Sequence, residues 1–103
     1  MTTKPYLLLN AGAYPVAFSF PVGDSPLLRV RGEIYSVPKN ILSNLDRLEG
    51  NGYLYERRLV GVQRLNHPEE QQCFMYFGMS RAWHRKIDTM PACFTHEGSY
   101  NWA

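Results

Sequence analysis

The sequence has few cysteines, no long apolar run and little net charge. Its two cysteines, Cys73 and Cys93, are too few for a disulfide framework, and no stretch approaches the length of a membrane span. A net charge of +2, without a basic run along one face, indicates neither a nucleic-acid nor a membrane partner. The N-terminus carries no signal-type apolar segment. We therefore expect a cytoplasmic protein with reduced thiols.

The usual signatures of metal and nucleophile sites are also missing. Cys93 and His96 form one closely spaced pair, and His84 or Cys73 could complete a ligand set. Zinc motifs normally show two tight pairs with regular spacing, so we expect no metal site. Neither a nucleophile motif nor a phosphate-binding glycine loop of the usual spacing occurs.

What the sequence does have is a high share of aromatic residues and a hydrophobic period of two. The length of 103 residues fits one domain with a modest core. Aromatic residues make up 14%, which favours strands and the walls of a pocket. Short apolar runs between turn residues predict five strands, at residues 6–9, 15–20, 27–37, 56–64 and 72–79.

The arrangement of these strands can be predicted in part. The last two could pair as a hairpin, and the most apolar one, 72–79, should be central. Gly32 interrupts the third run and predicts a bulge or a close backbone approach. We expect the core within about residues 6–80 and an irregular tail over 81–103, held by isolated aromatic anchors at Trp83, Phe94 and Trp102.

A single helix is predicted after Pro38, a residue suited to a first helical turn. Ile41, Leu42, Leu45 and Leu48 form one apolar stripe at helical spacing, and Gly50 or Gly52 is the natural C-terminal stop. Strands with one short helix between them indicate an α+β domain built on a small mixed, barrel-like sheet.

Glu49 is the candidate functional residue because it lies at the end of this helix, beside Tyr53 and Tyr55. A carboxylate fixed beside a pocket can take up and return a proton as a general base and acid. The alternative is a surface glutamate at a frayed helix end, where the last carbonyls carry partial negative charge. Asp46 and Glu33 are interpreted as surface charges, with Arg47 or Lys39 as partners of Asp46.

Four short segments are distinctive in their order and spacing: Gly12-Ala13-Tyr14-Pro15, Val30-Arg31-Gly32-Glu33-Ile34-Tyr35, Leu45-Asp46-Arg47-Leu48-Glu49-Gly50 and Tyr55-Glu56-Arg57. Together they resemble the γ-glutamylcyclotransferase-like (AIG2-like) family, and the likeness covers about residues 6–80. The resemblance implies a compact mixed barrel with a short helix between strands.

The resemblance also implies a reaction, the release of 5-oxoproline from a small γ-glutamyl amine or peptide. The substrate's own α-amine attacks its γ-carbonyl, so neither a nucleophile nor a cofactor is required. What remains for the enzyme is to fold the substrate back and to move one proton. Glu49 matches the family's proton shuttle, and Tyr55, Gly50 and Tyr14 lie in the matching elements as substrate-binding residues.

One family element is not found, a YGSL- or YGTL-type loop whose backbone amides hold the α-carboxylate of the substrate. We therefore expect an N-terminally shortened fold with an open sheet edge. Residues 4–9, the tail, a homo-oligomer or a protein partner could cover that edge. Two hypotheses follow. The chain is an active cyclotransferase with its anion cradle elsewhere, such as residues 23–25 or a second subunit, or it is a catalytically degenerate binding or assembly module.

Overall fold

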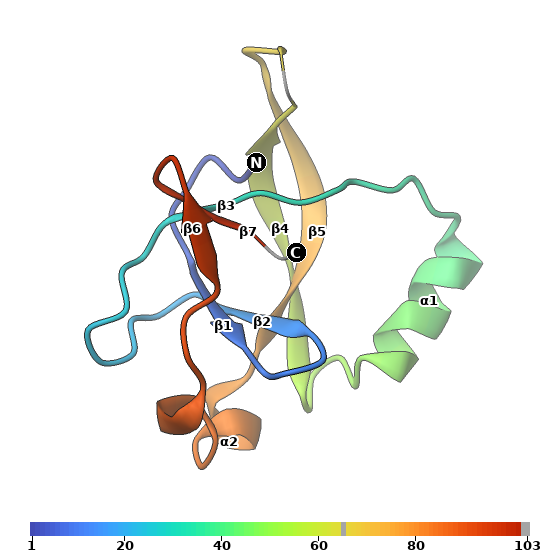
Figure 1. Ribbon diagram of the computed structural model, residues 1–103. Coiled ribbons are helices and arrows are strands. Elements are labelled where there is room, and N and C mark those ends of the chain that lie inside the picture. The colour runs from blue at the N-terminus through green and yellow to red at the C-terminus, as the bar shows by residue number, and fades with distance from the viewer. Residues whose placement is uncertain (65, 102–103) are drawn as a thin grey trace.

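A computed structural model describes residues 1–64 and 66–101 (Figure 1). Short strands follow each other through most of this part of the chain, and one three-turn helix interrupts them. The elements in chain order are β1 (Leu7–Asn10), β2 (Pro15–Phe18), β3 (Arg29–Val30), α1 (Lys39–Leu48), β4 (Tyr55–Gln63), β5 (Glu70–Gly78), α2 (Ser80–Trp83), a 3-10 turn (Ile87–Thr89), β6 (Phe94–His96) and β7 (Ser99–Asn101).

The strands form two sheets, with the orders β1-β2-β5-β4 and β3-β7-β6. The predicted hairpin is confirmed, because β4 and β5 pair antiparallel from Tyr55↔Gly78 to Gln63↔Glu70. The central position of β5 is confirmed as well, since β2 pairs parallel with its other edge at Ala17↔Phe77. Parallel and antiparallel pairs occur together, so the predicted mixed α+β fold is confirmed.

Isolated bridges link the two sheets into one body. Thr2 bridges to Val62, Tyr6 to Leu28 and Leu9 to Ala92. Within the described residues the strands therefore make two linked sheets, and the predicted barrel is not closed. Side chains from both sheets fill the space between them. The most deeply buried of these are Leu7, Leu9, Val16, Phe18, Phe77 and Tyr100.

The sheet edges that were expected to be open are bonded to neighbouring segments. At β1, the Cys93 amide donates to the Leu8 carbonyl at 2.9 Å, so the C-terminal tail covers this edge, as one of the predicted alternatives had it. At β4, the Thr3 amide donates to the Gly61 carbonyl at 2.9 Å, so the N-terminal residues pair with the end of this strand. Segments of the same chain therefore occupy part of both edges.

The strand predicted over residues 27–37 is wrong in length. Only Arg29–Val30 is a strand, and the ladder ends where the Arg31 amide donates to the Tyr100 carbonyl at 3.0 Å. Residues 31–38 then run exposed, without regular structure, towards α1 (Figure 1). Gly32 lies in this segment with nothing near its Cβ position, so it makes neither a bulge nor a close approach.

The expectation of an irregular tail is also corrected, because β6 and β7 pair with each other and β7 pairs with β3. The Tyr100 ring is fully buried and its hydroxyl donates to the Pro26 carbonyl, so the core extends well beyond residue 80. Trp83 is a buried anchor as expected. Phe94 is 74% exposed and is no anchor, while the predicted anchor Trp102 lies outside the described residues.

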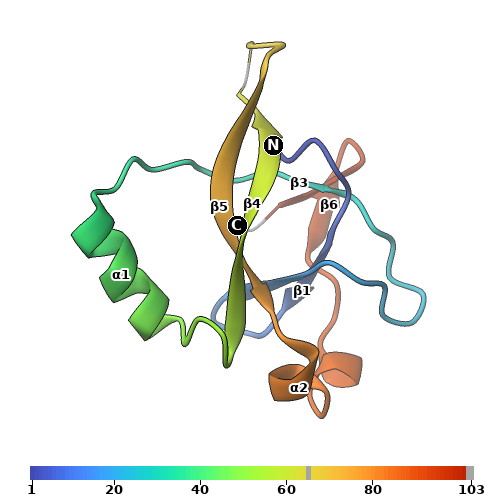
Figure 2. The same ribbon diagram turned by 180° about the vertical axis from the view of Figure 1, so that it is seen from behind.

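Helix α1 stands to one side of the β4–β5 hairpin, as both views show (Figures 1 and 2). Its bounds agree with the predicted stripe, and Pro38 is its N-cap. No α1 side chain is fully buried, and Leu48 is 80% exposed. In the described part of the chain, no helix has the length and apolar character needed to cross a membrane.

Tyr100→Ala should lower the free energy of unfolding by about 3–5 kcal/mol, because it removes a fully buried ring from between the sheets. Tyr100→Phe keeps the ring and loses one hydrogen bond, so it should cost about 1 kcal/mol. Urea unfolding of the variants measures both. Phe94→Ala is the matched control in the same tail, with an expected change within about 0.5 kcal/mol. A large effect at Phe94 and none at Tyr100 would contradict this core.

Candidate functional site

A capped helix end fixes the backbone of Glu49. Glu49 is the last αR residue, and Gly50 follows with a φ of 60°. The Gly50 amide donates to the Arg47 carbonyl at 3.2 Å, and the Asn51 amide donates to the Asp46 carbonyl at 2.8 Å. These two bonds make a Schellman motif, in which glycine takes the left-handed position without a steric cost. The predicted stop at Gly50 is confirmed.

Glu49 lies beside a pocket of about 380 Å³, a size suited to a small ligand. Tyr14 comes to this pocket from the turn before β2 and Pro15 from the start of β2, while Tyr55 comes from the start of β4 and Tyr76 from β5. Three of the predicted site residues, Glu49, Tyr55 and Tyr14, are therefore neighbours in space. The pocket is half-open, because Tyr14 is 48% exposed.

Gly50 does not line this pocket and contributes to the turn beneath it. Its carbonyl accepts hydrogen bonds from the Tyr53 amide at 2.8 Å and from the Leu54 amide at 2.9 Å. These bonds reverse the chain between α1 and β4, so that Tyr55 returns to the same pocket as Glu49.

The sequence reasoning missed Tyr76, which it placed in an apolar strand without a function. The hairpin register sets Tyr76 opposite Arg57, and Tyr55 opposite Gly78, on one face of the sheet. Alternate residues of a strand lie on the same face of the sheet, so a known register would have placed Tyr76 on the same face as Tyr55. The register itself depends on pairing between segments far apart in the sequence.

Asp46 was interpreted as a surface charge, and this interpretation is wrong. The Tyr76 hydroxyl donates to Asp46 Oδ1 at 2.5 Å, and Arg57 Nη1 lies 3.1 Å from Asp46 Oδ2. Both charged side chains are 23% exposed. Asp46 therefore connects α1 to both strands of the hairpin, one helical turn before Glu49.

Both inner tyrosines stay protonated at neutral pH. Burial raises the pKa of Tyr55 to about 12, and the neighbouring Tyr14 and Glu49 act in the same direction. Burial likewise raises the pKa of Tyr76 to about 12, with further contributions from the hydrogen bond to Asp46 and the charges of Asp46 and Glu49. Arg57 opposes this shift at Tyr76. The pocket thus joins one carboxylate to neutral aromatic walls.

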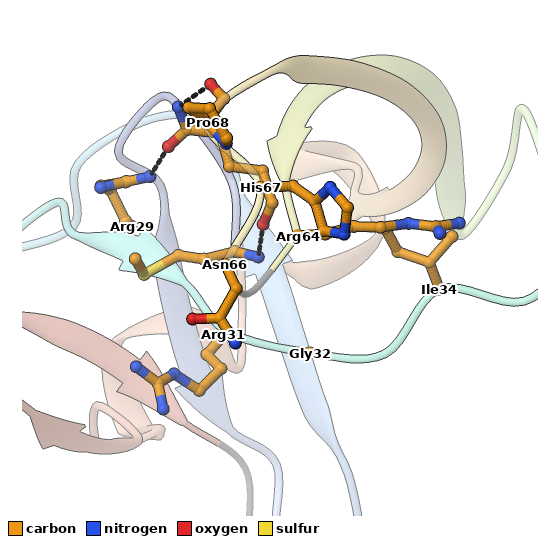
Figure 3. A pocket seen from close by; sticks show the side chains of 10 residues that line it. Arg29, Arg31, Gly32, Ile34, Arg64, Asn66, His67 and Pro68 are labelled. Carbon is orange, nitrogen blue, oxygen red and sulfur yellow. Dashed lines mark hydrogen bonds between the residues drawn. The ribbon is translucent and has the colours of Figure 1, made fainter.

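A second, larger pocket of about 510 Å³ lies between β3 and the turn after β4, remote in sequence from Glu49 (Figure 3). Arg29, Arg31 and Arg64 contribute to its lining. The Arg29 guanidinium is occupied by the Thr2 carbonyl and the Gln63 side chain, and Arg64 extends to the opposite side from Arg29 and Arg31. These cations diverge, and among the described residues that line this pocket there is a histidine, His67, but no carboxylate.

Two other expectations concern ligands and metals. Residues 23–25, considered as an anion cradle, do not line the Glu49 pocket. Cys93 packs in the core, where burial raises the pKa of its thiol to about 11, and His96 is exposed. Within residues 1–64 and 66–101, no group of three or more His, Cys, Asp or Glu side chains could hold a metal ion.

Comparisons with known proteins identify the family of this chain. A family model described as gamma-glutamyl cyclotransferase, AIG2-like, matches residues 1–100. The chain therefore belongs to this family. It is also 33% identical over 85 residues to human gamma-glutamylaminecyclotransferase, over 73% of this chain and 55% of that protein. The chain thus spans about half the length of this curated relative. No solved structure matches it.

The free energy of unfolding should fall as the pH rises from about 10 to about 12. In this window the unfolded chain has already lost phenolic protons that Tyr55 and Tyr76 keep in the folded state, so alkali favours unfolding. Urea unfolding across the window measures the decline. The double variant Tyr55→Phe/Tyr76→Phe should show a smaller decline than the wild type, and an equal decline would contradict the raised pKa values.

Proposed function

We propose that this chain is a γ-glutamylcyclotransferase that releases 5-oxoproline from γ-glutamyl amines or γ-glutamyl peptides. The observation that carries the proposal is the position of Glu49, held by the helix cap at a pocket with Tyr14, Tyr55 and Tyr76. Membership of the family and the likeness to a human enzyme named for γ-glutamylamines support the substrate class.

In the proposed reaction, Glu49 takes a proton from the α-ammonium of the substrate. The freed amine attacks the γ-carbonyl carbon, and a new C–N bond closes a five-membered ring. The original amide C–N bond then breaks as Glu49 returns its proton to the departing nitrogen, and the ring nitrogen loses a second proton, which the released amine takes up. The products are 5-oxoproline and the released amine in its ammonium form. Because the reaction is intramolecular, the enzyme would raise its rate by holding the substrate in a folded conformation and by positioning one proton carrier.

Two properties of the pocket support this reaction. Its tyrosine rings offer apolar contact to the two methylene groups of a folded γ-glutamyl chain. Glu49 is partly buried and its backbone is fixed by the Schellman motif, which limits the positions its carboxylate can adopt. A positioned acid–base group of this kind contributes about 10²–10⁴-fold to a rate.

Glu49→Gln should lower 5-oxoproline release by about 10²–10⁴-fold, because the amide cannot take the proton from the ammonium. The measurement is chromatographic detection of 5-oxoproline from a panel of γ-glutamyl amines and γ-glutamyl dipeptides. Glu69→Gln removes an exposed glutamate before β5 and serves as the matched control, with unchanged release expected.

Circular dichroism and urea unfolding establish that each variant is folded before rates are compared. Full activity in a folded Glu49→Gln protein would assign the proton transfer to another group. No release from any member of the panel by the folded wild type would overturn the proposed reaction.

A second candidate function is a catalytically silent binding or assembly module. The specific observation behind it is a pair of exposed apolar neighbours, Leu59 and Phe74, which face each other across β4 and β5 at 54% and 51% exposure. Apolar side chains gathered at one place on a surface are typical of interaction sites.

Solution mass measured by sedimentation tests this second function. A module that assembles through this face should show a mass above 11.9 kDa that falls towards the monomer in Leu59→Ser/Phe74→Ser. Thr95→Ser, an exposed position on β6, is the control. A wild type that stays monomeric at every concentration and still releases 5-oxoproline would favour the enzyme.

A further inference from the structure

Asp46, Arg57 and Phe74 form a network of contacts with Tyr76 that has no role in the reaction proposed above. Asp46 binds Tyr76 through one carboxylate oxygen and Arg57 through the other, at 2.5 and 3.1 Å. The Arg57 guanidinium carbon also lies 4.4 Å from the centre of the Phe74 ring. Arg57 is therefore held from two directions, by a charge and by an aromatic face.

Two backbone amides add hydrogen bonds to the same network. The Arg57 amide donates to the Asn51 side-chain oxygen at 2.8 Å, and the Asn51 amide donates to the Asp46 carbonyl at 2.8 Å. Isolated surface ion pairs are weak, but a network with fixed geometry holds its members in place. The orientation of the Tyr76 hydroxyl is accordingly set by α1, the turn after it and β4 together.

This arrangement determines what Tyr76 can offer to a ligand. A tyrosine hydroxyl has one hydrogen to donate and lone pairs to accept with. Because its hydrogen is donated to Asp46, the oxygen can only accept further hydrogen bonds. The Glu49 carboxylate and the hydroxyl oxygens of Tyr14 and Tyr55 are the other acceptors at this pocket, and among the described residues that line it there is no Lys, Arg or His side chain. Because its one charged group is an anion, the pocket favours a cationic hydrogen-bond donor.

We infer that Tyr76 is a substrate-binding residue whose oxygen accepts a hydrogen bond from the α-ammonium of the γ-glutamyl substrate, with Asp46 and Arg57 as its positioning residues. The inference rests on the proposed function for the identity of the substrate. An ammonium group has three hydrogens, so one can go to Glu49 while another binds Tyr76. After Glu49 removes its proton, the bond to Tyr76 keeps the nitrogen from rotating as its lone pair turns to the γ-carbonyl.

Binding can be tested apart from turnover in the Glu49→Gln protein. Calorimetry would compare a γ-glutamyl amine with the matching glutaryl amine, which lacks the α-amine. Tyr76→Phe in this background should weaken binding of the γ-glutamyl compound by about tenfold or more, the usual range for a hydrogen bond to a charged group. It should leave binding of the glutaryl compound unchanged. Equal effects on both compounds, or no preference for the ammonium, would overturn the inference.

Tyr35→Phe is the matched control. The Tyr35 hydroxyl also donates to a carboxylate, that of Glu33, but it lies on the exposed segment before α1 and outside the pocket. Loss of this hydroxyl should change the binding of neither the γ-glutamyl nor the glutaryl compound. An effect at Tyr35 equal to that at Tyr76 would show a general consequence of removing a phenol and would contradict the assignment.

The positioning role of Asp46 has its own readouts. Asp46→Ala should raise KM more than it lowers kcat, and Asp46→Asn, which keeps an oxygen for Tyr76, should recover part of the loss. The pKa of the Tyr76 phenol should also fall in Asp46→Ala, because the hydrogen bond and the charge of Asp46 are lost. An absorbance titration at alkaline pH detects the phenolate that forms. The part of the signal that belongs to Tyr76 should be absent in the double variant Asp46→Ala/Tyr76→Phe. An unchanged titration together with an unchanged KM would remove Asp46 from this role.

These outcomes separate the inference from the reaction. A wild type that binds γ-glutamyl compounds through Tyr76 but releases no 5-oxoproline would refute the reaction and keep the ammonium site. A wild type that releases 5-oxoproline with unchanged kinetics in Tyr76→Phe would keep the reaction and refute the site.

Discussion

The carboxylate of Asp46 is the interaction on which the candidate site depends. Helix α1 has no fully buried side chain, so packing against the core does not fix its position. Its C-terminal end is tied to β4 and β5 by the two bonds of Asp46 and by the capped turn at Gly50. Glu49 follows one turn later, so its distance from Tyr55 and Tyr76 is set by the same contacts. Removing the Asp46 side chain would break the bonds to Tyr76 and Arg57 and leave the backbone bonds of the capped turn in place.

The sheets supply a rigid platform for this arrangement at some distance from the chemistry. The core lies between the two sheets, around side chains such as Phe18, Phe77 and Tyr100, whereas the pocket opens on the outer face of the β4–β5 hairpin. Both chain ends strengthen the platform, since residues 1–3 bond to β4 and residues 91–93 bond to β1. Core and site therefore share β4 and β5 but use opposite faces of them, through the alternation of strand side chains.

Local signals in the sequence predicted the parts of the structure that depend on neighbours in the chain. The helical stripe and the glycine stop predicted α1 and the place of Glu49, and apolar runs predicted β4 and β5. Tyr76 and the partners of Asp46 could not be predicted, because they follow from a strand register that joins distant segments. Over residues 31–38 a strand was predicted from local composition and does not form. These residues have the composition of a strand, but in the described chain only Arg29–Val30 pairs with β7, and residues 31–38 are exposed and irregular.

The two pockets differ in the charge of the described side chains that line them. Arginines line the pocket beside β3, while the pocket at Glu49 has acceptor oxygens and aromatic rings. Arg57 is not among the residues that line the Glu49 pocket, and its guanidinium is paired with Asp46 at 3.1 Å. Asp46 thus has two contacts behind the pocket, because one carboxylate oxygen accepts the hydrogen of the Tyr76 hydroxyl and the other pairs with Arg57.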